Sequence, residues 1–217
     1  MKHLIIFLGV IAGCALATAS AGAATGPSSP APSNVRLPAE QIVLAGGCFW
    51  GMQAVFSDLK GVTKVMAGYA GGSKANAHYE LVSSGLTGHA ESVQITFDPS
   101  KISLQQLFEV DFFVAHDPTE LDRQGPDEGS QYRSVIFYEN EEQRRVALAY
   151  IAKLTQTKAF SAPIVTQVVP LPAFYPAEAY HQDYVAHNPD SPYVVYNDLP
   201  KLEELRKKYP QLVKPAS

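Results

Sequence analysis

Cys48 stands in the segment GGCFWG (residues 46–51), where a short β-rich run gives way to a helical pattern. A thiol at the start of a helix faces unsatisfied backbone N–H groups and the positive end of the helix dipole, which both stabilise a thiolate. The thiolate is the nucleophilic form of cysteine. We therefore expect Cys48 to have a lowered, or readily lowered, pKa and to attack an electrophile. The alternative is a buried structural cysteine, which is the commoner fate of a free thiol.

Two aromatic residues, Phe49 and Trp50, follow the thiol directly, and Trp50 is the only tryptophan in the chain. Aromatic rings beside a nucleophile can form the wall of an apolar pocket for a small methyl-bearing group. Phe49 shares a helical stripe with Met52, so it could equally pack in the core. Trp50 lies off that stripe, which favours the pocket for this side chain.

The charge balance of the chain argues against a nucleic-acid-binding protein. Lys and Arg total 17 against 21 Asp and Glu, the formal net charge is -4, and no basic run is present. Phosphate recognition usually needs a basic patch or stripe. Five histidines follow residue 24, but neither their spacing nor a cysteine pair matches a usual metal site, so we expect none. These histidines are His78, His89, His116, His181 and His187.

The first 24 residues have the pattern of a secretion signal. A polar start precedes the uncharged apolar run Leu4–Ala17, and Ala19–Ala21 offers an A-x-A cleavage site. The apolar run is too short for a spanning helix, which needs roughly 20 residues. Ile11–Cys14 resembles a bacterial lipoprotein box, so the alternative to simple cleavage is a membrane tether through a lipidated Cys14. We expect an exported protein, either periplasmic or lipid-anchored in the cell envelope.

Cysteine usage then leaves one thiol in the folded part of the chain. The sequence contains two cysteines, and Cys14 lies within the signal segment, so Cys48 has no partner for a disulfide. Residues 25–39 are rich in Pro, Ser and Ala and are interpreted as a flexible linker. An unpaired cysteine in an oxidising compartment is a chemical liability, which favours a functional role for Cys48.

Hydrophobic periodicity over residues 40–217 predicts a single α+β domain of mixed sheet and packed helices. A loop is expected over 116–130, and a long, aromatic, loop-rich tail is expected at the C-terminal end. Strands are predicted over 41–45, 62–69, 91–97, 132–138 and 164–169, and helices over 48–60, 103–115 (capped by Ser103) and 141–155.

Five segments together resemble the type A peptide methionine sulfoxide reductases. They keep the order of that family and span residues 42–188, essentially the whole predicted domain. The resemblance implies a ferredoxin-like α/β roll and a catalytic domain over residues 40–217. The segments are GCFWG at 47–51, GYAGG at 68–72, GHAE at 88–91, HDPT at 116–119 with DEGSQYRS at 127–134, and FYPAEAYHQDY at 174–184.

The resemblance also implies a role for each matching residue. Cys48 would attack the sulfoxide sulfur, and Glu91 would be the acid that protonates the sulfoxide oxygen. Partial burial could keep that carboxyl protonated, although without the resemblance Glu91 is only a charge at a strand start. Tyr79 and Tyr132 would donate hydrogen bonds to the oxygen. Asp127 would lie near the substrate, or alternatively only form a turn.

The implied reaction converts methionine S-sulfoxide, free or in oxidised proteins, to methionine and leaves a sulfenic acid on Cys48. Many family members then form a disulfide with a C-terminal cysteine, but no cysteine follows Cys48 here. We therefore expect a one-cysteine, monomeric variant with no bound cofactor, whose sulfenic acid is reduced by a thioredoxin-like or other external thiol. The preference for the S epimer rests on the resemblance alone.

Two other functions use the same cysteine. A cysteine hydrolase or acyltransferase would need a base beside Cys48, for which His89 or His181 could serve. An envelope thiol redox sensor would need only a reactive thiol. Trp50 beside the thiol and Glu91 as its proton partner favour the reductase.

Overall fold

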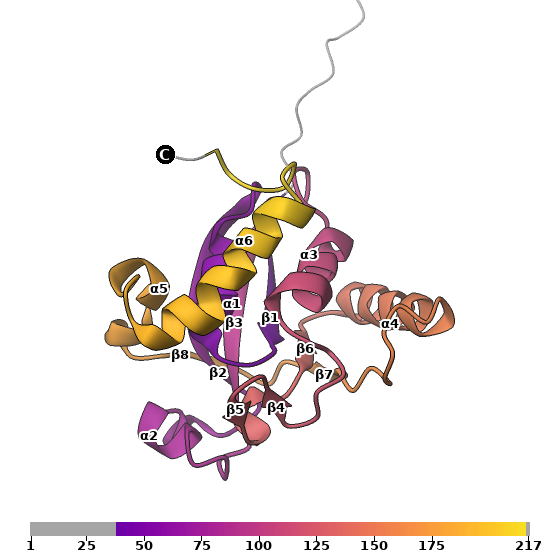
Figure 1. The fold of residues 1–217 in the computed structure, drawn as a ribbon. Coiled ribbons are helices and arrows are strands. Elements are labelled where there is room, and N and C mark those ends of the chain that lie inside the picture. The colour runs from indigo at the N-terminus through magenta and orange to yellow at the C-terminus, as the bar shows by residue number, and fades with distance from the viewer. Residues whose placement is uncertain (1–37, 216–217) are drawn as a thin grey trace, which may run out of the picture. The chain divides into compact units, whose positions relative to one another are not determined.

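Six strands form one mixed sheet in the order β7-β6-β1-β3-β2-β8 (Figure 1). The computed structural model describes residues 38–215, so the predicted signal peptide, Cys14 and nearly all of the linker lie outside the described residues. The strands of the sheet are β1 (Glu40–Ala45), β2 (Val62–Ala70), β3 (Ala90–Phe97), β6 (Val135–Tyr138), β7 (Gln167–Pro170) and β8 (Phe174–Pro176).

The pairing is antiparallel except at one edge of the sheet. Strand β1 pairs with β3 and β6, and β2 pairs with β3 and β8, all in antiparallel register. Strands β6 and β7 are parallel. A parallel pair needs a crossover connection, and helix α4 (Glu141–Gln156) lies between these two strands in the chain. A separate two-stranded hairpin joins β4 (Arg123–Gln124) and β5 (Asp127–Glu128).

Helices α1 (Phe49–Ser57), α3 (Leu104–Val110) and α6 (Leu199–Lys208) lie over the same face of the sheet (Figure 1). The first of them, α1, follows β1 directly, and α3 begins at a capping box in which Ser103 and Gln106 exchange hydrogen bonds. The two remaining α-helices of the described residues, α2 (Tyr79–Val82) and α5 (Tyr184–His187), are single short turns.

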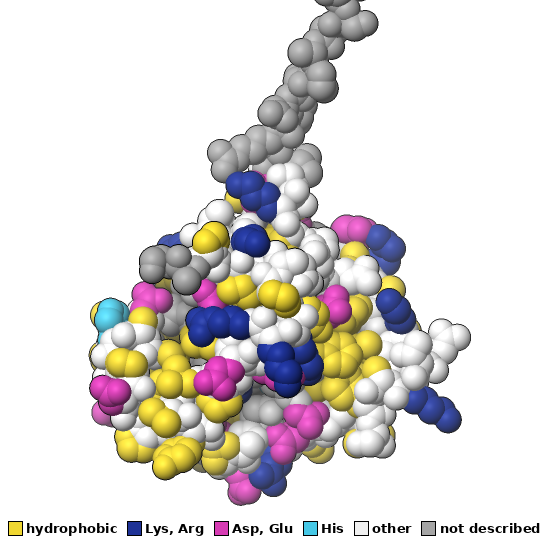
Figure 2. Space-filling view, turned by 45° about the horizontal axis from the view of Figure 1, so that its top comes forward, with side chains coloured by type: hydrophobic (Ala, Val, Ile, Leu, Met, Phe, Trp, Pro, Cys, Tyr) yellow, Lys and Arg dark blue, Asp and Glu magenta, His cyan; other side chains and the backbone are white. Residues whose placement is uncertain are grey.

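The surface mixes charges of both signs. On the face shown in Figure 2, the Lys and Arg side chains of the described residues are interspersed with acidic and hydrophobic ones and do not gather into one basic patch. Within residues 38–215, no helix has the length and apolar character needed to cross a membrane.

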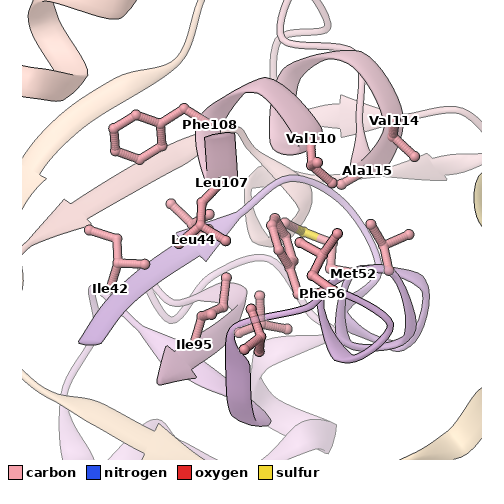
Figure 3. Close-up of a cluster of buried hydrophobic side chains, with 14 of the residues drawn as sticks. Ile42, Leu44, Met52, Phe56, Ile95, Leu107, Phe108, Val110, Val114 and Ala115 are labelled. Atoms are coloured by element: carbon pink, nitrogen blue, oxygen red, sulfur yellow. The ribbon is translucent and has the colours of Figure 1, made fainter. Parts of the chain in front are cut away.

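Alternation along β1 divides the hydrophobic core between the two faces of the sheet. Ile42 and Leu44 belong to the large cluster under the helices, whereas Val43 and Ala45 belong to a smaller cluster on the opposite face. Figure 3 shows Ile42 and Leu44 facing the side chains of α1 and α3. Burial on both faces fixes the register of β1, because a slip of one residue would exchange the two sets. The end of β1, and hence the start of α1, is therefore rigidly placed.

The structure confirms the single α+β domain with a mixed sheet, and it corrects several element boundaries. The predicted helix 48–60 ends as α1 at Ser57, the predicted strand 164–169 begins as β7 at Gln167, and the predicted loop 116–130 contains the β4–β5 hairpin. The predicted helix 103–115 ends as α3 at Val110, and a π-helical turn continues over Asp111–Ala115. The predicted strand 132–138 begins only at Val135, because Tyr132 lies in a short 3-10 turn. The C-terminal tail is less loop-rich than predicted, since it contributes β8 and α6; α6 has a proline in its first turn and buries Leu205 against the core.

Candidate active site

The junction between β1 and α1 places the thiol. Cys48 is the N-cap of α1, as predicted, and its residue surface is only 8% exposed. Gly47 turns the chain with φ +96°, a conformation that favours glycine. Its N–H donates a hydrogen bond of 3.1 Å to the carbonyl of Tyr132, and a Cβ here would lie 2.6 Å from Cγ of Gln124. The close approach of Gln124 therefore also requires glycine at this position.

The thiol opens onto a cavity of about 350 Å³. All seven residues that the sequence analysis singled out for catalysis or substrate binding line this cavity, so the fold brings the whole predicted set together; their individual roles remain predictions. The lining residues are Cys48, Phe49, Trp50, Tyr79, Glu91, Asp127, Tyr132, Tyr184, Ser191 and Tyr193.

Glu91 is a buried carboxyl beside the thiol. It lies on β3 opposite Tyr69 of β2 and is 2% exposed. One of its oxygens accepts a hydrogen bond of 3.1 Å from the backbone N–H of Phe49. Burial raises the pKa of Glu91 to about 8, and the charge of Asp127 adds to the rise, while the Phe49 N–H opposes it. At neutral pH the carboxyl is therefore mostly protonated and can donate its proton.

The resting thiol does not have the lowered pKa that its place at a helix N-terminus led us to expect. Burial raises the pKa of Cys48 well above its ordinary value, and the negative charges of Glu91 and Asp198 raise it further. The backbone N–H of Trp50 acts in the opposite direction and is outweighed. The local sequence shows the helix start but neither the burial nor the carboxyl groups that the fold brings to it.

Tyr79 and Tyr132 present their rings to the cavity from separate segments. The backbone N–H of Tyr79 donates to Glu178 (3.0 Å), which also accepts from the hydroxyl of Tyr69 (2.8 Å). Burial raises the pKa of Tyr79 and of Tyr132, so both hydroxyls stay protonated. Within residues 38–215 neither hydroxyl has a hydrogen-bond partner, so each can donate to a bound oxygen. The anchoring role of Glu178 was missed, although it lies in the segment FYPAEAYHQDY.

Trp50 forms one wall of the cavity. Its ring stacks on Tyr184 with centroids 3.7 Å apart, and its indole N–H donates to Nδ1 of His181 at 3.0 Å. The rings of Tyr193 and Trp50 are nearly perpendicular, with centroids 5.7 Å apart. Phe49 is 1% exposed and its ring lies 5.0 Å from that of His181, so it both packs in the core and contributes to the cavity. These contacts hold the indole in one orientation.

Neither histidine considered as a hydrolase base is hydrogen-bonded to Cys48. Nδ1 of His181 accepts from Trp50, and the ring of His89 contacts the N–H of Gly72 and the carbonyl of Ser73. A cysteine hydrolase needs a base within hydrogen-bond reach of its nucleophile. Neither histidine is therefore placed as the base that a cysteine hydrolase needs.

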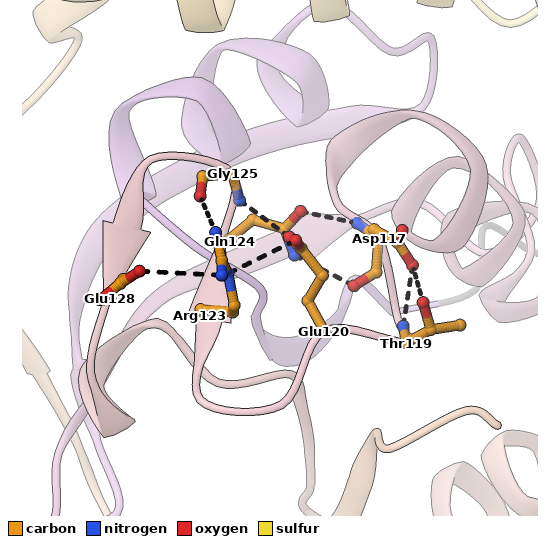
Figure 4. Close-up of polar contacts among 7 residues, drawn as sticks. All are labelled: Asp117, Thr119, Glu120, Arg123, Gln124, Gly125 and Glu128. Carbon is orange, nitrogen blue, oxygen red and sulfur yellow. Dashed lines mark hydrogen bonds and ion pairs between the residues drawn. The ribbon is translucent and has the colours of Figure 1, made fainter. Parts of the chain in front are cut away.

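Asp127 is held by a hairpin and by a tyrosine that the sequence analysis missed. The hydroxyl of Tyr193 donates to Oδ2 of Asp127, and burial raises the pKa of this half-buried carboxyl. The loop before it is cross-linked by polar contacts, in which Glu120 accepts from the N–H of Gly125 (2.8 Å) and the amide of Gln124 both donates to and accepts from the backbone of Asp117 (Figure 4). The network fixes the hairpin that carries Asp127.

A metal site was not predicted, and within residues 38–215 no group of three or more His, Cys, Asp or Glu side chains is arranged to hold a metal ion. The chemistry of the cavity is that of a thiol, a protonated carboxyl and phenol hydroxyls.

Comparison with known proteins agrees with this geometry. A family model described as peptide methionine sulfoxide reductase matches residues 40–213. The peptide methionine sulfoxide reductase MsrA 2 of Mesorhizobium japonicum is 55% identical over 173 residues, which cover 80% of this chain and 89% of the relative. The MsrA of Thermus thermophilus is 48% identical over 179 residues, which cover 82% of this chain and 100% of the relative.

Solved structures show the same fold. Reduced Mxr1 of Saccharomyces cerevisiae matches with a TM-score of 0.66 at 32% identity, covering 70% of this chain and 87% of the yeast chain. Methionine sulfoxide reductase A of Corynebacterium diphtheriae matches with a TM-score of 0.60 at 34% identity, covering 70% of this chain and 76% of that chain. This chain belongs to the peptide methionine sulfoxide reductase family, and its reaction is the reduction of methionine sulfoxide.

Proposed function

We propose that Cys48 carries out this reduction as the enzyme's one redox-active thiol, with Glu91 as the acid and Tyr79 and Tyr132 as hydrogen-bond donors to the sulfoxide oxygen. Trp50, with Phe49, receives the methyl group of the substrate, and Asp127 lies beside the rest of the methionine residue. The S epimer is the expected substrate, free or within a protein.

The oxygen atom moves from one sulfur to the other. The Cys48 sulfur forms a bond to the sulfoxide sulfur and gives up its proton, while Glu91 protonates the oxygen. The substrate's S–O bond and the new S–S bond then both break as the protonated oxygen bonds to the Cys48 sulfur, and the proton lost by the thiol restores Glu91. Methionine gains two electrons, and Cys48, which loses two, becomes a sulfenic acid.

The observation that carries this proposal is the pairing of a buried thiol with a buried, protonated carboxyl. The backbone N–H of Phe49, the residue after Cys48, holds Glu91 at 3.1 Å, so the acid is tied to the same turn as the nucleophile. Its pKa of about 8 supplies a proton at neutral pH. The oxygen gains charge only as its sulfur is attacked, so groups that meet it there lower the barrier rather than tighten binding.

Recycling of the sulfenic acid requires an outside thiol in this proposal. Cys48 is the free cysteine of the described residues, and Cys14 belongs to the predicted signal. One external thiol would condense with the sulfenic acid, releasing water and forming a mixed disulfide, and a second would release Cys48 as a thiol. A thioredoxin-like donor would fill this role.

Export completes the proposal. The segment of residues 1–24 supports a periplasmic location after cleavage or a lipid anchor at Cys14. Either route removes Cys14 as a second thiol, so the proposed enzyme works with Cys48 as its one cysteine; we propose a monomer as its oligomeric state.

A single-turnover assay without reductant tests the proposal. The wild-type enzyme should form one methionine per active site from methionine sulfoxide, and the Cys48 peptide should gain one oxygen in its mass. Cys48→Ser should form none. Turnover of a small sulfoxide with dithiothreitol separates an enzyme from a redox sensor, and full activity of Cys48→Ser would refute the assignment.

A further inference from the structure

A second buried carboxyl lies against the start of α1, the helix that Cys48 caps, and has no part in the proposed reaction. Asp198, at the junction of the π-helical turn Val194–Asp198 with α6, is 1% exposed. Within the described residues, neither of its carboxyl oxygens has a hydrogen-bond partner. An unpaired buried carboxyl costs free energy, so a native structure rarely keeps one without a reason.

Gly51 makes room for this carboxyl against the first turn of α1. A Cβ at Gly51 would lie 2.3 Å from Oδ1 of Asp198 and 3.4 Å from the amine of Lys201. The carboxyl of Asp198 is therefore seated three residues after Cys48, at the positive end of the nine-residue helix that the thiol caps. Lys201, in the first turn of α6, is a nearby positive charge.

Three acidic groups thus share one helix end. The N–H of Phe49 is taken by Glu91, the N–H of Trp50 faces the Cys48 sulfur, and Asp198 lies against Gly51. Groups this close cannot all carry negative charge at low cost, so their ionisations are coupled. A charge on Asp198 therefore opposes a charge on Cys48.

We propose that Asp198 is a positioning residue for the sulfur chemistry: its buried charge against Gly51 adds to the effect of burial in holding Cys48 as a neutral thiol in the resting enzyme, and Lys201 limits how strongly. The inference rests on the proposed role of Cys48. A neutral thiol reacts slowly with alkylating agents and oxidants. In this proposal Cys48 loses its proton only as it attacks a bound sulfoxide whose oxygen is protonated by Glu91.

The other charged and titratable groups around Asp198 fit this assignment. Burial raises the pKa of Asp198 to about 6; Lys201 lowers it and Asp127 raises it. Asp198 is therefore ionised throughout the range in which Cys48 titrates. The hydroxyl of Tyr193 also lies within its field, but burial raises the pKa of that tyrosine, which stays neutral.

The test is the pH dependence of iodoacetamide alkylation at Cys48, followed in the full chain as the mass of the Cys48 peptide. Asp198→Asn keeps the side-chain volume and removes the charge, so the midpoint should move to lower pH and alkylation at pH 7–8 should be about three- to tenfold faster. Lys201→Met should move the midpoint the other way. Asp58→Asn removes a carboxylate at the far end of α1, which pairs with Arg206 of α6, and should leave it unmoved.

An unchanged or higher midpoint in folded Asp198→Asn would overturn the inference, as would shifts of Asp198→Asn and Lys201→Met in the same direction. If Asp198→Asn does not fold, Lys201→Met decides alone, and an unmoved midpoint rejects the proposal. Alkylation needs no sulfoxide, so its outcome is separate from single-turnover methionine formation, which tests the proposed function in the same samples.

Discussion

At the scale of single residues, the buried carboxyl of Glu91 lowers the stability of the fold and also holds the proton that the proposed reaction uses. Its burial costs stability, because the unfolded chain releases its proton above its ordinary pKa of 4.5 while the folded chain retains it up to about pH 8. Between these values the folded state binds one more proton than the unfolded state, so this group lowers the free energy of unfolding by about 1.4 kcal/mol for each pH unit gained. In the proposed reaction, the same retained proton passes to the sulfoxide oxygen.

Glu91→Gln removes the titrating carboxyl, so it should change stability and reaction rate in opposite directions. The variant should be more stable than the wild type by an amount that grows from pH 5 to pH 8 and reaches a few kcal/mol, as measured by urea unfolding at each pH. Its single-turnover rate should fall about 10²- to 10⁴-fold, and the wild-type loss of rate above about pH 8 should vanish. A stability difference independent of pH would show that Glu91 is ionised in the folded enzyme.

The two tyrosines give a prediction of a different kind, because their hydroxyls have no partner to lose within residues 38–215. Tyr79→Phe and Tyr132→Phe should each slow single-turnover methionine formation about 10- to 100-fold. Their effect on the free energy of unfolding should be small, since no buried group is left unpaired. Tyr196→Phe, at a residue 79% exposed, is the matched control. Loss of substrate affinity without loss of rate would assign these hydroxyls to binding alone.

At the scale of elements, the turn between β1 and α1 sets the position of the thiol. Gly47→Ala would place a Cβ against Gln124 at φ +96°, which we expect to destabilise the fold by about 1–3 kcal/mol and to lower the single-turnover rate. Ser103→Ala, which removes the cap of α3, should cost about 1 kcal/mol and leave the rate unchanged. Equal kinetic losses in both variants would mean that general stability, not this turn, limits the rate.

The local elements of this site could be predicted from sequence, and its long-range contacts could not. A strand, two glycines and an apolar helical stripe predict where Cys48 lies, and the structure confirms it as the cap of α1. Glu178, Tyr193 and Asp198 were missed because each acts on a residue about 65 or more positions away. The periodicity of hydrophobic residues carries no signal for such contacts. The expectation of a lowered pKa for Cys48 was wrong for the same reason, because burial and the charges of Glu91 and Asp198, which raise it, depend on residues that are distant in the sequence.

At the scale of the whole molecule, the free thiol of the described residues lies at the base of a cavity of about 350 Å³. In the proposed reaction, each sulfoxide reduced leaves an oxidised Cys48 sulfur that the described residues cannot reduce again, because they contain no second cysteine. The rate of steady turnover should therefore be set by how fast an external thiol reaches Cys48, and the surface around the cavity becomes part of the catalytic cycle.

A single cysteine in the working enzyme predicts the chemical state of Cys48 after it has reduced a sulfoxide. After sulfoxide treatment without reductant, the protein should carry one added oxygen and form a dimedone adduct at Cys48, the reaction typical of a sulfenic acid. Turnover should then rise in proportion to the concentration of added thiol. Intact mass spectrometry checks both the oxidation state and the N-terminus. A loss of two hydrogens in place of a gained oxygen would reveal an intramolecular disulfide, and with it a second thiol that survives export.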